Sequence, residues 1–295
     1  MVVLTWGAHF AVVKQALSSV EPMAFSVLRF SMAAVFLLAL VRWKEGQVAI
    51  PRRYWLPMLA LGMIGAGNQV LWMYGLNYTT SGKSALLLAA SPAFVVTMRA
   101  LRGERVGARV ALSILIAFIG VAFIVDPTGE GAPGELLGDL LTLGASFMWA
   151  LYANTGPMML ATFSPLRVTA YVFCVIALVV SIPGLGLALA TPWREMPFSV
   201  WWQLGYSCFL AAGLAWFLWY RGVSQLGPVK VILYQYLVPV VALFISVYWM
   251  AEGFHWQQGL GAALVLTGTL GARLWLPSPV PETAVLQEDQ AAPGK

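Results

Sequence analysis

The sequence predicts an all-α polytopic membrane protein whose ten transmembrane helices form two inverted repeats of five helices. Three observations carry this prediction. Of the 295 residues, 60% are hydrophobic and only 10% are charged, against roughly 25% charged residues in a typical soluble domain. The apolar residues are gathered in long runs between short polar loops. The two halves of the chain also repeat the same pattern of residues.

The composition argues against several function classes. A mean hydropathy of +0.79 leaves too few charged side chains to cover a water-soluble globule. An ordinary soluble enzyme, a nucleic-acid-binding protein and a disordered protein are therefore disfavoured. Cys174 and Cys208 both lie inside apolar runs, so the sequence predicts buried thiols and no disulfide framework.

Each apolar run approaches the 20 or so residues that a helix needs to cross the hydrocarbon. Polar or helix-breaking segments separate the runs, for example residues 42–53, 191–197 and 222–228. The first run lacks a basic segment before it and a small-residue cleavage site after it, so we expect a membrane helix and not a signal peptide. The expected helices cover residues 2–18, 22–41, 55–76, 82–100, 108–125, 136–158, 165–190, 198–220, 229–250 and 256–276.

The basic residues predict the orientation of these helices. Thirteen of the seventeen Lys and Arg residues fall on the face that holds the loops after even-numbered helices and the C-terminus, and only three fall on the other face. Because Lys and Arg are enriched in cytoplasmic loops, we expect a multi-pass protein of the cell (inner) membrane with both termini in the cytoplasm. The opposite face collects acidic residues, namely Glu21, Asp126, Glu130, Glu135, Asp139, Glu195 and Glu252.

The two halves align at a nearly constant offset. Trp6 and Pro22 are matched by Trp149 and Pro165. Further matches join Trp72, Gly75, Lys83 and Pro92 to Trp219, Gly222, Lys230 and Pro239. Since each unit holds an odd number of helices, the second unit enters the membrane from the opposite side, as in transporters that work by alternating access. We expect a first repeat at residues 1–126, a second, inverted repeat at 127–276, and a disordered cytoplasmic tail at 277–295.

Ordered short motifs in both halves also resemble a known family. They are Leu4–Gly7, Glu21–Phe30, Gly82–Pro92, Arg102–Arg105 followed by Gly120, and Ala251–Gly253 followed by Gly268. The chain resembles the EamA-type exporters of the drug/metabolite transporter superfamily, including the branch that exports aromatic and hydrophobic amino acids. The resemblance implies ten helices in two repeats and the export of amino acids or related metabolites. Arg29 aligns with Val172 in the second repeat, so any role of Arg29 is asymmetric.

Ionisable groups within the expected helices are candidates for function, because they are costly in a bilayer. His9 either bonds to a neighbouring helix or lines the substrate path. Arg29 lies about 10 Å along its helix from Pro22, where we expect a structural or gating role. Lys83 begins a helix after Gly82, and the helix N-terminus with the added charge suits a carboxylate. Interfacial anchoring explains Lys83 equally well.

Aromatic and amide side chains complete the candidate site. Trp6 with His9, and Trp149 with Tyr152, share the i, i+3 spacing that places two side chains on one helix face. Helix packing explains any single one of them as well as a cavity does. The predicted substrate-binding residues are His9, Gln69, Trp72, Tyr78, Lys83, Trp149, Tyr152 and Tyr234, and the predicted gating or hinge residues are Arg29, Pro92 and Pro239.

The sequence lacks the patterns of several other mechanisms. No Asp or Glu falls in the middle third of an expected helix, no P-loop is present, and no His/Cys/Asp cluster has metal-ligand spacing. We therefore expect a non-enzyme with no catalytic residue, metal ion or cofactor. Its partners would be a small-molecule substrate and the lipid bilayer, with no nucleic acid, and a monomer is compatible with this architecture.

Two function classes follow. The first is a secondary transporter that exports amino acids, large hydrophobic or aromatic ones above all, or related small metabolites. The alternative is a membrane-embedded enzyme or a lipid flippase with an unrecognised site. An enzyme requires a polar catalytic cluster, which the sequence does not show, and a lipid carrier requires an open lateral groove.

Overall fold

The computed structural model describes residues 1–103, 107–125, 132–235, 237–253 and 255–275, and within these ranges the secondary structure is entirely helical. The expected tail at 277–295 lies outside the described residues. The helices are α1 (Val2–Ala16), α2 (Pro22–Glu45), η1 (Arg52–Tyr54), α3 (Trp55–Tyr78), α4 (Ser81–Leu88), α5 (Ser91–Leu101), α6 (Ala108–Ile124), α7 (Glu135–Thr155), α8 (Pro157–Leu160), α9 (Pro165–Ala190), η2 (Trp193–Glu195), α10 (Phe198–Gly205), η3 (Tyr206–Leu214), α11 (Ala215–Gln235), α12 (Leu237–Tyr248) and α13 (Trp256–Trp275).

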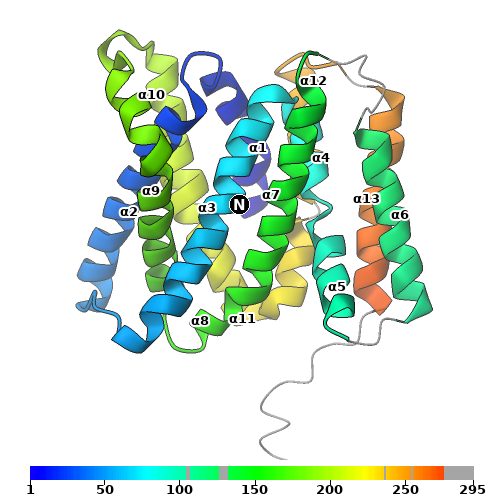
Figure 1. Ribbon diagram of the computed structural model, residues 1–295, viewed down its shortest axis with the longest axis horizontal. Coiled ribbons are helices and arrows are strands. Elements are labelled where there is room, and N and C mark those ends of the chain that lie inside the picture. The colour runs from blue at the N-terminus through cyan, green and yellow to red at the C-terminus, as the bar shows by residue number, and fades with distance from the viewer. Residues whose placement is uncertain (104–106, 126–131, 236, 254, 276–295) are drawn as a thin grey trace, which may run out of the picture.

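The long helices run side by side as one bundle (Figure 1). Within the described part of the chain, five helical segments are long and apolar enough to cross a membrane. Two shorter apolar helices, α6 and α12, accompany them. Large apolar side chains such as Val35, Leu178 and Ile182 are 69%, 71% and 85% exposed. An outward apolar surface of this kind suits contact with lipid. Together with the long apolar helices, it indicates the fold of a multi-pass membrane protein.

Matching sequence features start the helices α2 and α9. Glu21 accepts hydrogen bonds from the backbone nitrogens of Met23 (2.7 Å) and Ala24 (2.8 Å), and Pro22 occupies the first turn. At the start of α9, Ser164 accepts from the nitrogen of Arg167 (3.1 Å), again followed by a proline. Such caps satisfy backbone donors that have no partner within the helix, and they set the entry points of two helices that pack together.

Two expected boundaries differ from the structure. The expected helix at 82–100 is divided into α4 and α5 by a turn at residues 89–90, just before Pro92. The expected loop at 222–228 is wrong, because α11 remains helical from Ala215 to Gln235. Gly222, Gly227 and Pro228 favour a loop, but one proline removes a single backbone hydrogen bond and can bend a helix without ending it.

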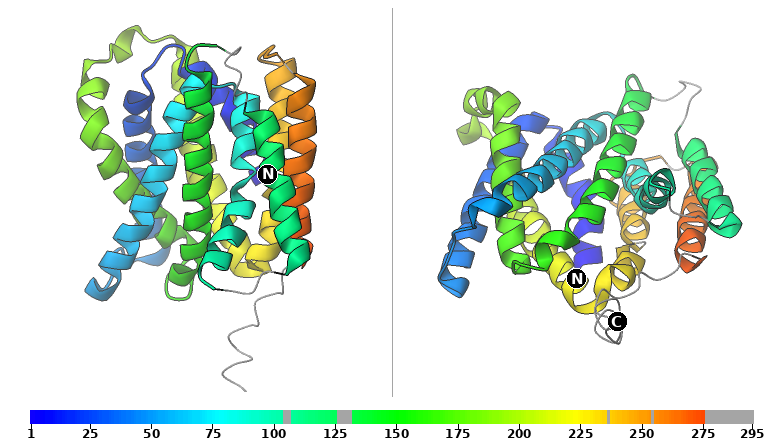
Figure 2. Two further views of the ribbon diagram at one scale, coloured as in Figure 1. Left: turned by 45° about the vertical axis from the view of Figure 1, so that its right-hand side comes forward. Right: turned by 60° about the horizontal axis from the view of Figure 1, so that its bottom comes forward.

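The helices pack in pairs across the bundle. α2 lies against α9 at one side, and α6 lies against α13 at the other (Figure 1). Figure 2 shows α6 and α13 as an edge pair beside the rest of the bundle. Glycines permit this pairing, since a Cβ at Gly268 would lie 2.5 Å from the backbone nitrogen of Ala117.

The same close approach joins α3 to α7. A Cβ at Gly138 would lie 2.8 Å from the backbone nitrogen of Thr79, and a Cβ at Gly75 would lie 2.5 Å from the hydroxyl of Thr142. Small residues at such contacts bring helix backbones together where lipid offers no hydrophobic drive for association. The contact also fixes the ends of α3 and α7 next to each other, which positions the polar cluster described below.

Candidate functional site

A cavity lies at the centre of the bundle, between the two halves of the chain. Its volume is about 140 Å³. Because a water molecule in the liquid occupies about 30 Å³, the cavity has room for several waters or one small organic molecule. Its lining residues are Trp6, His9, Phe10, Arg29, Asn68, Gln69, Trp72, Ala85, Leu88, Ala89, Ser91, Pro92, Trp149, Trp216, Val238 and Pro239.

Aromatic rings form much of the cavity wall. The ring of Trp149 stands edge-on to Trp6 at 5.8 Å between centroids, and to Trp216 at 5.5 Å. Phe10 meets Trp72 in the same way at 5.6 Å. Rings arranged edge to face are held in place by their quadrupoles. The cavity therefore presents a rigid apolar wall built from α1, α3, α7 and α11.

The π-helix η3 fixes the side chains of α1. The indole Nε1 of Trp6 donates to the carbonyl oxygen of Ala211 at 3.0 Å. The Nε2 atom of His9 lies 2.7 Å from the hydroxyl of Ser207, and the imidazole stacks on Trp72 at 5.2 Å. π-helical turns are rare and are found mostly at functional sites. Here the wide turn presents a carbonyl and a hydroxyl to two residues of the cavity wall, so His9 both bridges helices and lines the cavity.

Arg29 reaches the cavity from α2. Its side chain is only 2% exposed, and within the described part of the chain its Nε and Nη1 atoms have no hydrogen-bond partner. The guanidinium carbon lies 4.6 Å from the ring centre of Phe30 and 5.6 Å from that of Trp72. Cation–π contacts of this kind hold the group in place and leave Nε and Nη1 free to donate to a ligand.

Two more buried polar atoms of the cavity residues lack partners in the described structure, namely Oε1 of Gln69 and Nε1 of Trp72. The amide of Gln69 is oriented by its neighbour, because its Nε2 donates to Oδ1 of Asn68 at 2.7 Å. Asn68 in turn donates from Nδ2 to the carbonyl oxygen of Ala145 at 2.8 Å. Buried polar groups are normally satisfied, so three unsatisfied side chains lining one cavity are characteristic of a ligand site.

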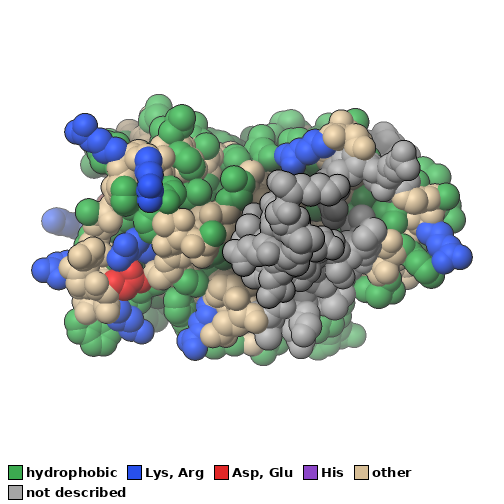
Figure 3. Space-filling view, turned by 90° about the horizontal axis from the view of Figure 1, so that it is seen from below, with side chains coloured by type: hydrophobic (Ala, Val, Ile, Leu, Met, Phe, Trp, Pro, Cys, Tyr) green, Lys and Arg blue, Asp and Glu red, His purple; other side chains and the backbone are tan. Residues whose placement is uncertain are grey.

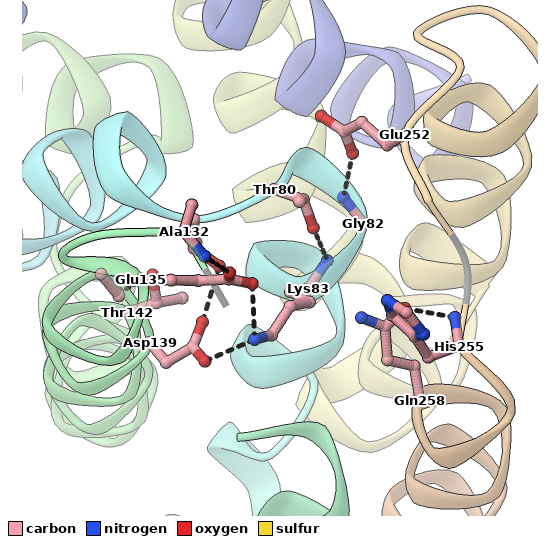
Figure 4. Close-up of polar contacts among 12 residues, drawn as sticks. Thr80, Gly82, Lys83, Ala132, Glu135, Asp139, Thr142, Glu252, His255 and Gln258 are labelled. Carbon is pink, nitrogen blue, oxygen red and sulfur yellow. Dashed lines mark hydrogen bonds and ion pairs between the residues drawn. The ribbon is translucent and has the colours of Figure 1, made fainter. Parts of the chain in front are cut away.

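Lys83, a predicted substrate contact, is not among the residues that line the cavity. Its Nζ forms ion pairs with Glu135 at 2.8 Å and with Asp139 at 2.7 Å (Figure 4). Asp139 also accepts from the hydroxyl of Thr79 at 2.6 Å. The close contact of α3 with α7 brings these groups together. The ammonium group of Lys83 is therefore paired with two carboxylates of the protein.

Glu252, which follows α12, binds the start of α4. Its carboxylate accepts from the backbone nitrogens of Ser81 (3.0 Å) and Gly82 (3.2 Å). It also accepts from the hydroxyls of Ser81 (2.8 Å) and Ser246. Together with Lys83 and its carboxylates, these contacts form an outer clasp that joins the ends of α4, α7 and α12. Lys83 of the clasp precedes the cavity residue Ala85 by two residues of α4, which is about 3 Å along the helix axis.

The remaining predicted site residues are distributed around the cavity. Pro92 and Pro239 both line it. Pro92 follows the turn between α4 and α5, and Pro239 is the third residue of α12. Tyr152 is fully buried behind the wall, where it stacks on Trp149 at 5.6 Å and hydrogen-bonds to Tyr220.

Two predicted aromatic contacts are not part of the described cavity. Tyr78 is 43% exposed at the end of α3 and lies against Gly134, away from the cavity lining. The side chain of Tyr234 lies outside the described residues. The cavity thus brings together four of the predicted substrate-binding residues with the predicted gating residue Arg29. The four are His9, Gln69, Trp72 and Trp149.

Phe10 and Trp216 also line the cavity but are not among the predicted site residues. Both could have been found: Phe10 adjoins His9, and Trp216 lies at the same repeat offset from Gln69 that separates Trp72 and Trp219. The sequence predicts Asp139 only as one of the acidic residues on the face opposite the basic one. Its position four residues after Glu135, on the same side of a helix, indicates the paired arrangement seen with Lys83.

A bundle of membrane helices around a cavity with an aromatic wall and unsatisfied polar groups defines a multi-pass membrane protein with an internal binding site. Comparison with known proteins identifies the family. The model of the EamA-like transporter family matches residues 1–126 and again residues 136–274. The chain belongs to the EamA-like transporter family.

Individual relatives are similar along most of their length. The chain is 27% identical to the "Uncharacterized transporter YyaM" of Bacillus subtilis, covering 90% of this chain and 89% of the relative. It is 26% identical to the "Probable amino-acid metabolite efflux pump" of Escherichia coli, covering 91% of both chains. It is also 26% identical to the "Probable terminal-alkyne amino-acid exporter" of Streptantibioticus cattleyicolor, covering 92% of this chain and 90% of the relative. A solved crystal structure shares the fold, with a TM-score of 0.64 and 18% identity over 92% of this chain and 94% of the other.

Proposed function

We propose that the protein is a secondary transporter that exports large hydrophobic or aromatic amino acids, or related small metabolites, by alternating access. The observation that carries the proposal is the central cavity, whose aromatic wall and free guanidinium suit a molecule with an apolar part and an anionic part. Two relatives whose printed names refer to amino-acid export support the same substrate class.

The helix contacts support an inverted repeat. If α1 to α6 and α7 to α13 are two such units, α2 corresponds to α9 and α6 to α13, and each of these pairs is in contact. α3 contacts α9, and the corresponding segment η3 contacts α2. α1 contacts α12, and the corresponding α7 contacts α4 and α5. Contacts that recur in this way favour a pseudo-two-fold arrangement, which offers two exchangeable conformations around one site.

The two ends of the bundle differ in their polar contacts. Alternating access requires such a difference, because each conformation is closed on one side of the membrane and open on the other. The outer clasp joins α4, α7 and α12 at the end where α3 passes into α4. Figure 3 shows the opposite end, where Lys and Arg side chains are scattered over the surface. With basic residues toward the cytoplasm, the clasp would close the external side, and both termini would be cytoplasmic in the inner membrane.

The test of the function is competition for labelled phenylalanine flux in liposomes that contain the purified protein. We expect unlabelled methionine, leucine and tryptophan to compete, and aspartate and a cationic drug to compete poorly, because the described cavity holds one cation and an apolar wall. Trp149→Ala should weaken competition by tryptophan about 2- to 10-fold, from the 0.5–1.5 kcal/mol of an aromatic pair.

The matched control is Trp201→Ala, which removes an indole that is 42% exposed and away from the cavity. Its competition profile should equal that of the parent protein. If aspartate or the drug competes while the apolar amino acids do not, the proposed substrate class is wrong.

A further inference from the structure

Arg29 occupies a position that neither anchoring nor gating explains. It is the eighth residue of α2, about 10 Å along the helix from its start, and its side chain is 2% exposed. A long basic side chain that anchors a helix reaches for the interface, but this one is enclosed. A gating arginine would pair with a carboxylate, and within the described structure no ion pair involves Arg29.

The chemistry of the guanidinium points to one kind of ligand. A cation removed from water without a partner is strongly unfavourable, so an anion that enters the cavity gains by pairing with it. The planar fork of donors matches the two oxygens of a carboxylate. Nε and Nη1 have no partner within the described structure. Each of the two donor edges of the guanidinium, Nε with Nη2 and Nη1 with Nη2, therefore has a nitrogen available to such a carboxylate.

The neighbouring polar atoms define the rest of the ligand. Nε1 of Trp72 is a free donor beside Arg29, and Oε1 of Gln69 is a free acceptor. No Asp or Glu is among the described residues that line the cavity. An ammonium group would therefore meet an amide oxygen and aromatic faces, but no opposite charge.

We propose that Arg29 binds the carboxylate of the transported molecule, and that recognition depends on this carboxylate far more than on an ammonium group. The proposal rests on the proposed function and deepens it. The preferred class becomes carboxylates with a large apolar part, and it includes 2-oxo acids as well as amino acids.

The first measurement is competition for labelled phenylalanine flux by analogues that each lack one group. Phenylpyruvate keeps the carboxylate and lacks the ammonium, and we expect it to compete within a few-fold of phenylalanine. Phenylalaninamide keeps the ammonium and lacks the carboxylate, and we expect it to be ~10–100-fold weaker, the loss typical of a charged hydrogen bond. Equal competition by the two analogues would overturn the proposal.

Variants assign the preference to a residue. Arg29→Gln should bring phenylalanine and phenylalaninamide within about 3-fold of each other, and Arg29→Lys should retain part of the preference because it keeps the charge without the fork. The matched control is Lys14→Gln, which removes a cation of α1 that lies outside the cavity and donates to the carbonyl oxygen of Leu76. It should leave the competition ratio unchanged. A purely structural Arg29 would lower the yield of folded Arg29→Gln protein and leave this ratio as in the parent.

A binding measurement separates this proposal from the proposed function. Phenylpyruvate should raise the thermal denaturation midpoint of the detergent-solubilised parent protein, and Arg29→Gln should abolish the rise. Stabilisation without any amino-acid flux would support the carboxylate site at Arg29 and refute the export of amino acids. No stabilisation by phenylpyruvate, or equal stabilisation by inorganic phosphate as from a lipid headgroup, would refute the carboxylate site.

Discussion

Replacing Lys83 by methionine tests the outer clasp. The ammonium is 2% exposed and lies 2.7 Å from Asp139, whose side chain is 1% exposed. Lys83→Met therefore leaves a buried carboxylate without its cation, which costs about 3–5 kcal/mol. Asp139→Asn is milder, since Lys83 keeps its contact with Glu135, which is 19% exposed. Loss of one charged hydrogen bond there costs about 1.5–3 kcal/mol.

The double variant makes the test specific. Lys83→Met with Asp139→Leu replaces the whole pair by apolar side chains, an exchange that is often neutral or stabilising. We expect it to recover most of the stability that Lys83→Met loses. Simple addition of two independent losses would make the double variant the least stable of the three.

Thermal denaturation in detergent, followed by tryptophan fluorescence, supplies the assay. At roughly 2 °C per kcal/mol for a chain of this size, Lys83→Met should lower the midpoint by roughly 6–10 °C. Asp139→Asn should lower it by roughly 3–6 °C. A double variant no more stable than Lys83→Met would refute the buried ion pair as the reason for the loss.

Three further predictions concern topology and transport. Reporter fusions in the loop at Thr191 should report the outside and fusions at Gly46 the cytoplasm, and the reverse pattern would refute both the orientation and the inverted repeat. Pro92→Ala should reduce flux more than it reduces folded protein if the α4–α5 break is a hinge, whereas unchanged flux makes Pro92 a packing residue. His9→Gln should abolish the effect of a pH gradient on flux and leave gradient-free exchange intact, since an imidazole is the one mid-helix group that titrates near neutral pH in water. If the parent protein ignores a pH gradient, His9 carries no proton.

The fold was largely predictable because the membrane restricts the choice of structure. Backbone groups in lipid must be satisfied within the segment, so a long apolar run forms a helix, and residues such as Pro22 and Pro165 mark where helices begin. The continuation of α11 through Pro228 was not predictable, because proline bends some helices and ends others.

The candidate site was predictable only in part, because it depends on pairing across the bundle. His9, Trp72 and Trp149 follow from helical spacing and repeat position. From the sequence, both Lys83 and Arg29 are cations within expected helices, and we predict substrate contact for Lys83 and a structural or gating role for Arg29. Contacts between helices decide between them: α7 supplies two carboxylates to Lys83, and the described structure supplies none to Arg29.

The number of residues in the π-helix η3 affects how its polar groups meet the side chains of α1. Each residue of an α-helix turns the chain by about 100°, so loss of one residue between Ser207 and Trp216 would turn the wide segment into a tighter helix. Because a π-helical turn holds one residue more than an α-helical turn, this tightening would absorb the loss, and Trp216 would keep its direction toward Trp149. The residues inside the segment would shift, so the contact of Ala211 with Trp6 depends on the length of this segment, whereas the place of Trp216 in the wall does not.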